Sequence, residues 1–280
     1  NKAGSFISSD YYVEKLPKWL DDFNKNLNID SYQDSIWEKS LKNSYYKKYA
    51  RNDHYFGETD DYLNAVYSPV FPIGFDRDVD PKSSIMGRPW FEREVLKLSK
   101  LAIKKEKLGI DLEPDLLCIG FSAMDWIIHD YGPYSQEVMD ACIKLDNYIG
   151  DFIDFIDIEV GLDNVLFVLT ADHGGLPLPE YVNEQGGSGG RINGAHLNEA
   201  LQWIDEECEE RIGDTFYHRD GANFFLDMEK LKKEGLSPDI IYNIVNQYIT
   251  NVDGIDKIAI KDSILQSKKD DKTILRIKNM

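Results

Sequence analysis

The sequence predicts an α/β fold in which a mostly parallel sheet is flanked by helices. Two short apolar runs, DLLCIGF (115–121) and VLFVL (165–169), have the composition of strands that are covered on both faces. Between them, residues 136–156 place apolar side chains at alternating steps of four and three, which is typical of one face of a helix. Strand, helix and strand at this spacing form a βαβ unit, and its crossover makes the two strands parallel.

Composition and charge narrow the classes of partner. The chain has 280 residues, of which 42% are apolar and 12% aromatic, enough for a substantial core in two domains or one large α/β unit. Its 50 acidic residues against 32 basic ones give a net charge of -18, which argues against nucleic acid or an anionic membrane as a partner. No apolar run reaches the ~18 residues that a membrane-spanning helix needs. The three cysteines have no metal-site spacing, and we expect packed thiols rather than a disulfide or a zinc–thiolate site.

Helices and one irregular segment are expected before the βαβ unit. The first helix is opened by Pro17, and a second is expected across 32–49. Prolines, glycines and charges between about 60 and 90 indicate an inserted surface segment rather than a core element. An amphipathic pattern over 91–107 predicts a further helix, which Gly109 ends.

After the βαβ unit, the pattern changes to that of a smaller α+β segment. The glycine-rich stretch 184–196 lacks the spacing of a phosphate-binding P-loop, and we interpret it as a flexible connection. The expected elements are a helix over 197–210, a hairpin turning on Asp220-Gly221, helices at 228–234 and 238–250, and a strand at 257–260. We therefore expect residues 1–190 to belong to the core domain and residues 191–280 to form a cap-like segment.

Carboxylate and imidazole side chains follow both strands of the βαβ unit. Asp125 and His129, four residues apart, come after the first strand, and Asp172 and His173 come directly after the second. Parallel strands end at the same edge of a sheet, which is where open α/β sheets hold their ligands. Either motif alone could be accidental, or could be a loop cap or a surface pair. Their recurrence at two neighbouring strand ends predicts one shared site.

A metal centre is the simplest explanation of that site. Two carboxylates brought together in an acidic chain repel each other unless a cation lies between them. Imidazole combined with carboxylate suits zinc, whereas calcium and magnesium favour more oxygen ligands. Two metal ions clamp the attacking and leaving oxygens of a displacement at phosphorus, so phosphoryl transfer is the reaction class that the pattern favours.

At these residues the sequence resembles the alkaline phosphatase superfamily, and within it the monomeric, zinc-dependent bacterial alkaline phosphatases. The resemblance rests on the similar order, spacing and flanks of three stretches: AGSFISSDYYVEKLPKWLDDFN (3–24), PDLLCIGFSAMDWIIHDYGPYSQEVMDACIKLDNYIGDF (114–152) and LTADHGG (169–175). It weakens after Gly175. The resemblance implies an alkaline-phosphatase-like fold, with Asp125 and His129 binding one Zn²⁺ and Asp172 and His173 binding the other.

Other parts of the family's site have no counterpart in the sequence. The resemblance implies a further Asp ligand, a Thr or Ser nucleophile and phosphate-gripping Lys and Arg before residue 1, and a His ligand after residue 280. We therefore expect a fold that is incomplete at both ends and a chain that is inactive by itself. His196 could substitute as a ligand, but it opens an expected helix and matches no family position.

The resemblance implies that the full-length parent hydrolyses phosphate monoesters with two Zn²⁺ ions. It also implies small phosphorylated substrates, a monomeric state and a periplasmic or extracellular location. Two alternatives stay open: a nucleotide pyrophosphatase or phosphodiesterase of the same superfamily, which shares both metal sets, and a non-catalytic protein that keeps a metal-site fold. A sulfatase is less expected, because its modified Cys- or Ser-based nucleophile motif is missing from the sequence.

Overall fold

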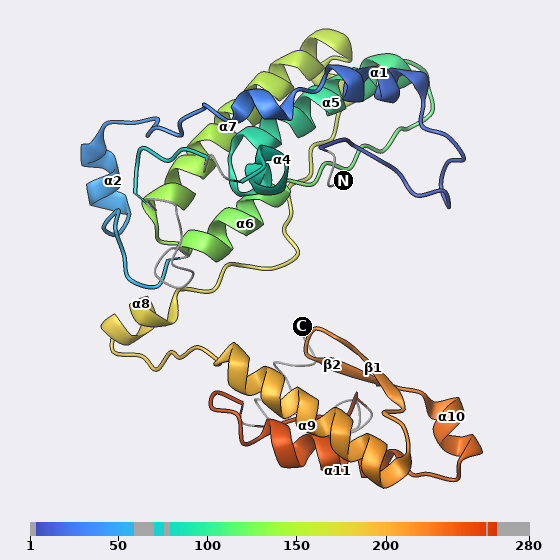
Figure 1. Ribbon diagram of the computed structural model, residues 1–280. Coiled ribbons are helices and arrows are strands. Elements are labelled where there is room, and N and C mark those ends of the chain that lie inside the picture. Colours follow the sequence, from blue (N-terminus) through green and yellow to red (C-terminus); the bar gives the residue numbers. More distant parts are fainter. Residues whose placement is uncertain (1–3, 59–69, 76–78, 256, 262–280) are drawn as a thin grey trace. The chain divides into compact units, whose positions relative to one another are not determined.

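The chain folds into two compact units, residues 1–189 and residues 190–280 (Figure 1). The computed structural model describes residues 4–58, 70–75, 79–255 and 257–261. None of the helices in these ranges is long and apolar enough to cross a membrane.

The first unit is built mainly from helices. The central ones are α5 (Trp90–Glu106), α6 (Ser122–Tyr131) and α7 (Gln136–Glu159), and α7 packs against both of the others (Figure 1). The shorter elements are α1 (Lys18–Asn26), η1 (Ile29–Tyr32), α2 (Asn43–Tyr49), α4 (Pro81–Ser84), η2 (Ile85–Gly87), η3 (Leu162–Asn164) and α8 (Pro179–Glu184).

The apolar periodicity of the sequence explains the pairing of α5 with α7. Leu96 and Ile103 of α5 form one buried cluster with Phe152 and Ile156 of α7, so the C-terminal part of the predicted α7 stripe packs against α5. The Ser135 side chain accepts a hydrogen bond from the backbone N–H of Val138 and so caps the first turn of α7. The helices predicted after Pro17, over 91–107 and over 136–156 are confirmed as α1, α5 and α7.

The helix predicted across 32–49 is wrong for most of its length. Only α2 at its end is a regular helix, and a 3₁₀ turn ends at Tyr32. Between them the Trp37 backbone exchanges two hydrogen bonds with Ile73, at N–O distances of 2.7 and 3.0 Å. The Trp37 side chain is fully buried, and an extended backbone places it in the core better than a helix would.

The segment at about 60–90 is not the surface excursion that its composition indicated, as far as it is described. Ile73, Phe75 and Ile85 are all less than 10% exposed, and α4 and η2 lie within the segment. Residues 59–69 and 76–78 lie outside the described ranges. The prolines and glycines of this segment therefore do not exclude its described residues from the core.

The two strands predicted at 115–121 and 165–169 do not form in the described residues. Ile119 and Phe121 pack against the α5–α7 cluster, so one side of the first run faces the core, whereas only Val165 of the second run packs there. The rest of the second run is open: Leu166 and Leu169 are 88% and 86% exposed. A strand requires a neighbour that pairs with its backbone, and the described part of the chain offers these runs none.

The second unit packs three helices and a hairpin around its own core. Its elements are α9 (Gly194–Ile212), β1 (Tyr217–Asp220), β2 (Asn223–Leu226), α10 (Met228–Lys233) and α11 (Pro238–Ile249). Ile204 of α9 and Ile244 of α11 are fully buried at the centre of this core. The three predicted helices and the hairpin are confirmed. The strand predicted at 257–260 is wrong, because no described residue of that stretch pairs with another strand.

The expectation of packed thiols holds for one cysteine only. Cys208 is buried in the core of the second unit, whereas Cys118 and Cys142 are exposed. All three lie in the described residues and are free, so they form no disulfide there. Cys118 belongs to the run 115–121, and it is not among the residues of that run that pack against the α5–α7 cluster.

A buried carboxyl group lies at the N-terminal end of α7. Glu137 is fully buried, and neither of its side-chain oxygens makes a well-formed hydrogen bond within the described part of the chain. Burial raises the pKa of Glu137 to about 9, and the nearby carboxylates of Glu58 and Asp53 act in the same direction. The folded chain therefore keeps this carboxyl group protonated at neutral pH.

Replacing Glu137 with glutamine is expected to flatten the pH dependence of stability. The folded pKa is about 9 and the ordinary value is 4.5, so the stabilisation is complete below pH 4.5 and is lost as the pH rises to about 9. Between these limits, wild type should lose up to about 1.4 kcal/mol of unfolding free energy per pH unit relative to Glu137→Gln. Urea unfolding from pH 5 to 9 measures this difference, with exposed Glu38→Gln as the control. Parallel curves for wild type and Glu137→Gln would contradict the prediction.

Candidate metal centre

The four predicted ligands lie on two segments of the first unit. Asp125 and His129 are on α6, four residues apart and therefore on one face of the helix. Asp172 and His173 lie in the irregular chain that leads from residue 165 to α8. All four side chains are at least half exposed, with relative side-chain exposures from 50% to 89%.

Asp125 is the residue that links the two segments. Its Oδ1 atom lies 3.5 Å from Nε2 of His129 and 3.7 Å from Nε2 of His173. The same His173 nitrogen lies 3.7 Å from Oδ2 of Asp172. The structure thus brings the four residues into one connected cluster, although these contacts do not join Asp172 directly to His129.

A close contact between Gly175 and α6 holds the two segments together. A Cβ atom at residue 175 would lie 2.4 Å from Cγ2 of Ile128, so a side chain there would push the segment away from the helix. The sequence places a glycine at this position, two residues after His173. The glycine is therefore explained by the approach of His173 to Asp125.

The ring of His173 is oriented by its neighbour. Its Nδ1 atom lies 3.2 Å from the carbonyl oxygen of Gly174. A carbonyl oxygen can only accept, so this contact requires a proton on Nδ1, and in the neutral imidazole Nε2 is then the nitrogen with the lone pair. Nε2 is the nitrogen that faces Asp125 and Asp172, and a histidine that binds a metal ion has this arrangement.

The donor distances suit zinc, although the set is incomplete. Tetrahedral zinc with bonds of about 2.1 Å places neighbouring donor atoms roughly 3.4 Å apart. Asp125 Oδ1 and His129 Nε2 have nearly this separation, at 3.5 Å. However, no three His, Cys, Asp or Glu side chains in the described ranges are arranged to hold one ion together. Carboxylate and imidazole donors at this spacing fit a zinc ion in chemistry, and the described residues supply fewer than three donors to any one position.

Glu92, which was not among the predicted site residues, supports α6 from the neighbouring helix α5. Its Oε1 atom accepts hydrogen bonds from the backbone N–H groups of Ala123 and Met124, at 2.6 and 3.3 Å. A signal was present in the sequence, because Glu92 lies on the stripe that continues through Leu96 and Ile103. A carboxylate on an otherwise apolar helix face indicates a buried partner.

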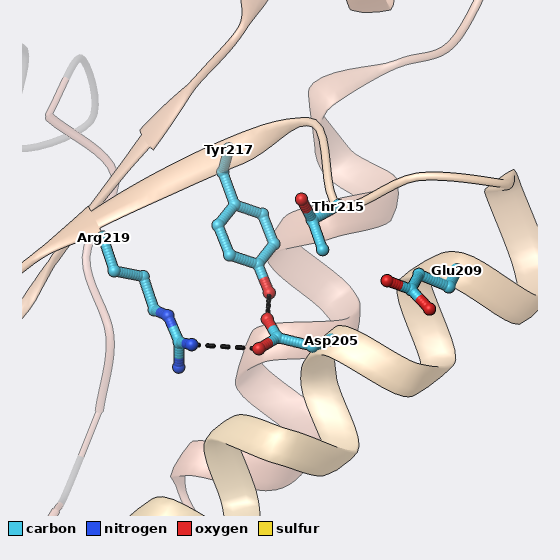
Figure 2. A pocket seen from close by; sticks show the side chains of 5 residues that line it. All are labelled: Asp205, Glu209, Thr215, Tyr217 and Arg219. Atoms are coloured by element: carbon cyan, nitrogen blue, oxygen red, sulfur yellow. Dashed lines mark hydrogen bonds and ion pairs between the residues drawn. The ribbon is translucent and has the colours of Figure 1, made fainter.

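A second polar site lies in the second unit, where α9 meets the hairpin. This open pocket has a volume of about 400 Å³ and is lined by Asp205, Glu209, Thr215, Tyr217 and Arg219. Figure 2 shows Tyr217 and Arg219 both directed at the carboxylate of Asp205. The Tyr217 hydroxyl donates to one oxygen, and Arg219 binds the other at 2.9 Å. Asp205 is thus already paired, and the lining offers no imidazole or thiol ligand.

One protein-family model matches most of the chain. Residues 6–234 match the model of the type I phosphodiesterase / nucleotide pyrophosphatase family. The matched range contains the first unit beyond its first residues, both candidate ligand pairs and about half of the second unit.

Similarity to individual proteins agrees with this assignment. The chain is 31% identical over 191 residues to alkaline phosphatase PhoV of Synechococcus elongatus. This alignment covers 68% of this chain and 34% of PhoV. It is 27% identical over 264 residues to a protein of Myroides odoratus named calcium-transporting ATPase. That alignment covers 91% of this chain and 46% of the Myroides protein. The chain thus spans less than half the length of these relatives.

The fold matches that of a solved alkaline phosphatase. The crystal structure of wild-type alkaline phosphatase PafA superposes with a TM-score of 0.75 at 24% identity, covering 98% of this chain and 52% of PafA. This likeness confirms the predicted α/β fold class, although the strands at 115–121 and 165–169 are unpaired in the described residues. The chain belongs to the type I phosphodiesterase / nucleotide pyrophosphatase family, within the alkaline phosphatase superfamily of phosphoester hydrolases.

Proposed function

We propose that this chain supplies four ligands of a two-zinc centre that hydrolyses phosphate monoesters. The observation that supports the proposal most strongly is the position of Asp125 Oδ1, which lies within 3.7 Å of Nε2 of both His129 and His173. We assign Asp125 and His129 to one ion, and Asp172 and His173 to the other. When bound, such ions polarise the phosphoryl oxygens and stabilise the negative charge that develops during displacement at phosphorus.

The residues of the chain have definable tasks in this centre. The 125/129 pair keeps its spacing because both side chains project from one face of α6. His173 offers Nε2 because its other ring nitrogen is engaged by the Gly174 carbonyl. The exposure of all four side chains leaves room for a phosphate group to approach, and the small phosphorylated substrate would reach them from solvent.

The family model favours a second candidate, hydrolysis of phosphodiesters or nucleotide pyrophosphates. Both activities use the same metal pairs, so these four residues do not separate them. The difference lies in the charge of the substrate, because a monoester dianion requires more positive charge around phosphorus than a diester does. The similarity to alkaline phosphatase PhoV supports the monoesterase. We extend the proposal to a monomeric protein located in the periplasm or outside the cell.

One set of measurements tests the proposal. The protein in its longest natural form should contain about two Zn²⁺ ions and hydrolyse p-nitrophenyl phosphate faster than bis-p-nitrophenyl phosphate. His129→Ala should lose zinc and activity together, whereas His54→Ala, an exposed histidine outside the cluster, should retain both. Faster hydrolysis of the diester would favour the second candidate. A protein that binds no zinc and shows neither activity would leave the non-catalytic alternative.

A further inference from the structure

Glu92 is a buried acid that faces the beginning of α6. It lies on the first turn of α5 and is 1% exposed. Its Oε1 atom accepts from the N–H groups of both Ala123 and Met124, which belong to the first turn of α6. The bond to Ala123, at 2.6 Å, is short, as expected when the acceptor is a carboxylate.

These bonds replace a cap that the local sequence does not provide. The residue before α6 is Phe121, whose side chain has no hydrogen-bond acceptor. The first N–H groups of a helix have no partner within the helix, and a capping side chain normally accepts from them. Glu92 satisfies two of these donors from 31 residues away, and its negative charge lies at the positive end of the helix dipole.

The capped turn leads directly into the candidate ligands. Asp125 follows Met124, and His129 lies one turn further along the same face. A shift of the first turn would move the Asp125 carboxylate away from His173, which lies on a separate segment. The position of the first turn therefore decides whether the two segments meet.

We propose that Glu92 is a positioning residue of the metal centre: its carboxylate fixes the first turn of α6, so that Asp125 and His129 face His173. This inference rests on the proposed function. Glu92 itself is not a ligand, since it contacts the helix backbone. Ligand-supporting groups of this kind typically change metal affinity by 10- to 100-fold when they are removed.

The chemistry of the site supports the design of a conservative variant. Burial raises the pKa of Glu92 to about 7, and the two backbone N–H groups partly oppose this rise. The second carboxylate oxygen, Oε2, is buried without a hydrogen-bond partner within the described part of the chain. Glutamine keeps an oxygen that can accept from both N–H groups and introduces no buried charge. Glu92→Gln should therefore retain the cap.

A matched control is available on the same helix. Glu94 is also buried on α5, and the partners of its carboxylate are Tyr32, Arg93 and Lys97, none of which belongs to α6. Glu94→Ala removes a buried carboxylate of the same type without touching the cap. A loss of metal affinity that merely followed loss of stability would appear in both alanine variants.

Two readouts test the inference: Co²⁺ affinity, followed by absorption spectroscopy, and hydrogen exchange of the Ala123 and Met124 amides. In Glu92→Ala, these amides should exchange at least tenfold faster, and Co²⁺ should bind about 10- to 100-fold more weakly. Glu92→Gln should stay within about threefold of wild type in both measurements. Glu94→Ala should leave both readouts unchanged.

Several outcomes would overturn the inference. These are wild-type Co²⁺ affinity in folded Glu92→Ala, an equal loss in Glu94→Ala, or unchanged exchange of the two amides. If Glu92→Ala does not fold, Glu92→Asp takes its place, because the shorter side chain keeps the charge but withdraws the acceptor. If the wild-type protein binds no Co²⁺, the proposed function fails. The exchange rates of the Ala123 and Met124 amides then test by themselves whether Glu92 caps α6.

Discussion

Replacement of Asp125 with alanine is expected to lower the affinity of the protein for Zn²⁺ by more than about 100-fold. Loss of a group that merely supports a ligand costs 10- to 100-fold, and loss of a ligand should exceed this. Asp125 should be the most sensitive of the four residues, because its Oδ1 atom lies within 3.7 Å of Nε2 of both histidines. Asp172→Ala should have the smaller effect, since Asp172 contacts His173 alone.

The same replacement should leave the fold nearly unchanged. The Asp125 side chain is 50% exposed, and surface substitutions of this kind usually change the unfolding free energy by no more than about 0.5 kcal/mol. Zinc titration in the presence of a competing chelator measures the affinity, and urea unfolding of the metal-free protein measures stability. Asp146→Ala, an exposed aspartate on α7, is the matched control. Wild-type affinity in Asp125→Ala would contradict the assignment of Asp125 as a ligand.

The helices were predictable because each one carries its own signal. The apolar stripe of α7 and the serine cap at Ser135 are both local, and Phe152 and Ile156 of the stripe pack against α5. Pro17 similarly marks the start of α1. The helix predicted across 32–49 failed because Trp37 pairs with Ile73, a contact that the local pattern does not contain.

The strands could be recognised as apolar runs but not as strands of this structure. The apolar composition of a run such as VLFVL (165–169) indicates that its side chains should be buried. It does not indicate which segment pairs with its backbone, because that segment lies elsewhere in the sequence. In the described residues, the α5–α7 cluster covers one side of the run 115–121 and only Val165 of the run 165–169. Residue spacing nevertheless located Asp125 and His129, because a helix brings residues four apart together regardless of its tertiary setting.

Contacts between distant residues were beyond prediction from one sequence. Glu92 caps a helix 31 residues later, and nothing near Ala123 identifies the acceptor. Asp140 was likewise not distinguished from the other acidic residues of α7, although it makes the largest set of buried polar contacts in that helix. In the sequence, such a residue appears only as a charged side chain on an otherwise apolar helix face. This pattern indicates that the side chain has a buried partner, but it does not identify that partner.

Asp140 joins the chain around Trp37 to α7. It is fully buried, and its two oxygens accept hydrogen bonds from Trp37 Nε1 at 2.6 Å, the Ser40 N–H at 2.6 Å and the Tyr46 hydroxyl at 2.5 Å. The ammonium group of Lys144, one turn further along α7, lies 3.3 Å from Oδ2. Four donors thus converge on one carboxylate.

Replacing Asp140 with alanine should destabilise the first unit by about 3 to 5 kcal/mol. The cost arises because the donors stay buried without an acceptor, and Lys144 loses its counter-ion. Asp140→Asn should recover only part of the loss, since its amide group presents donors to other donors. Urea unfolding at pH 7, followed by tryptophan fluorescence, measures the change in unfolding free energy. Asp146→Ala on the same helix is the control. A loss below about 1 kcal/mol would show that the four contacts contribute little to the fold, and that apolar packing around Trp37 is sufficient to hold this segment against α7.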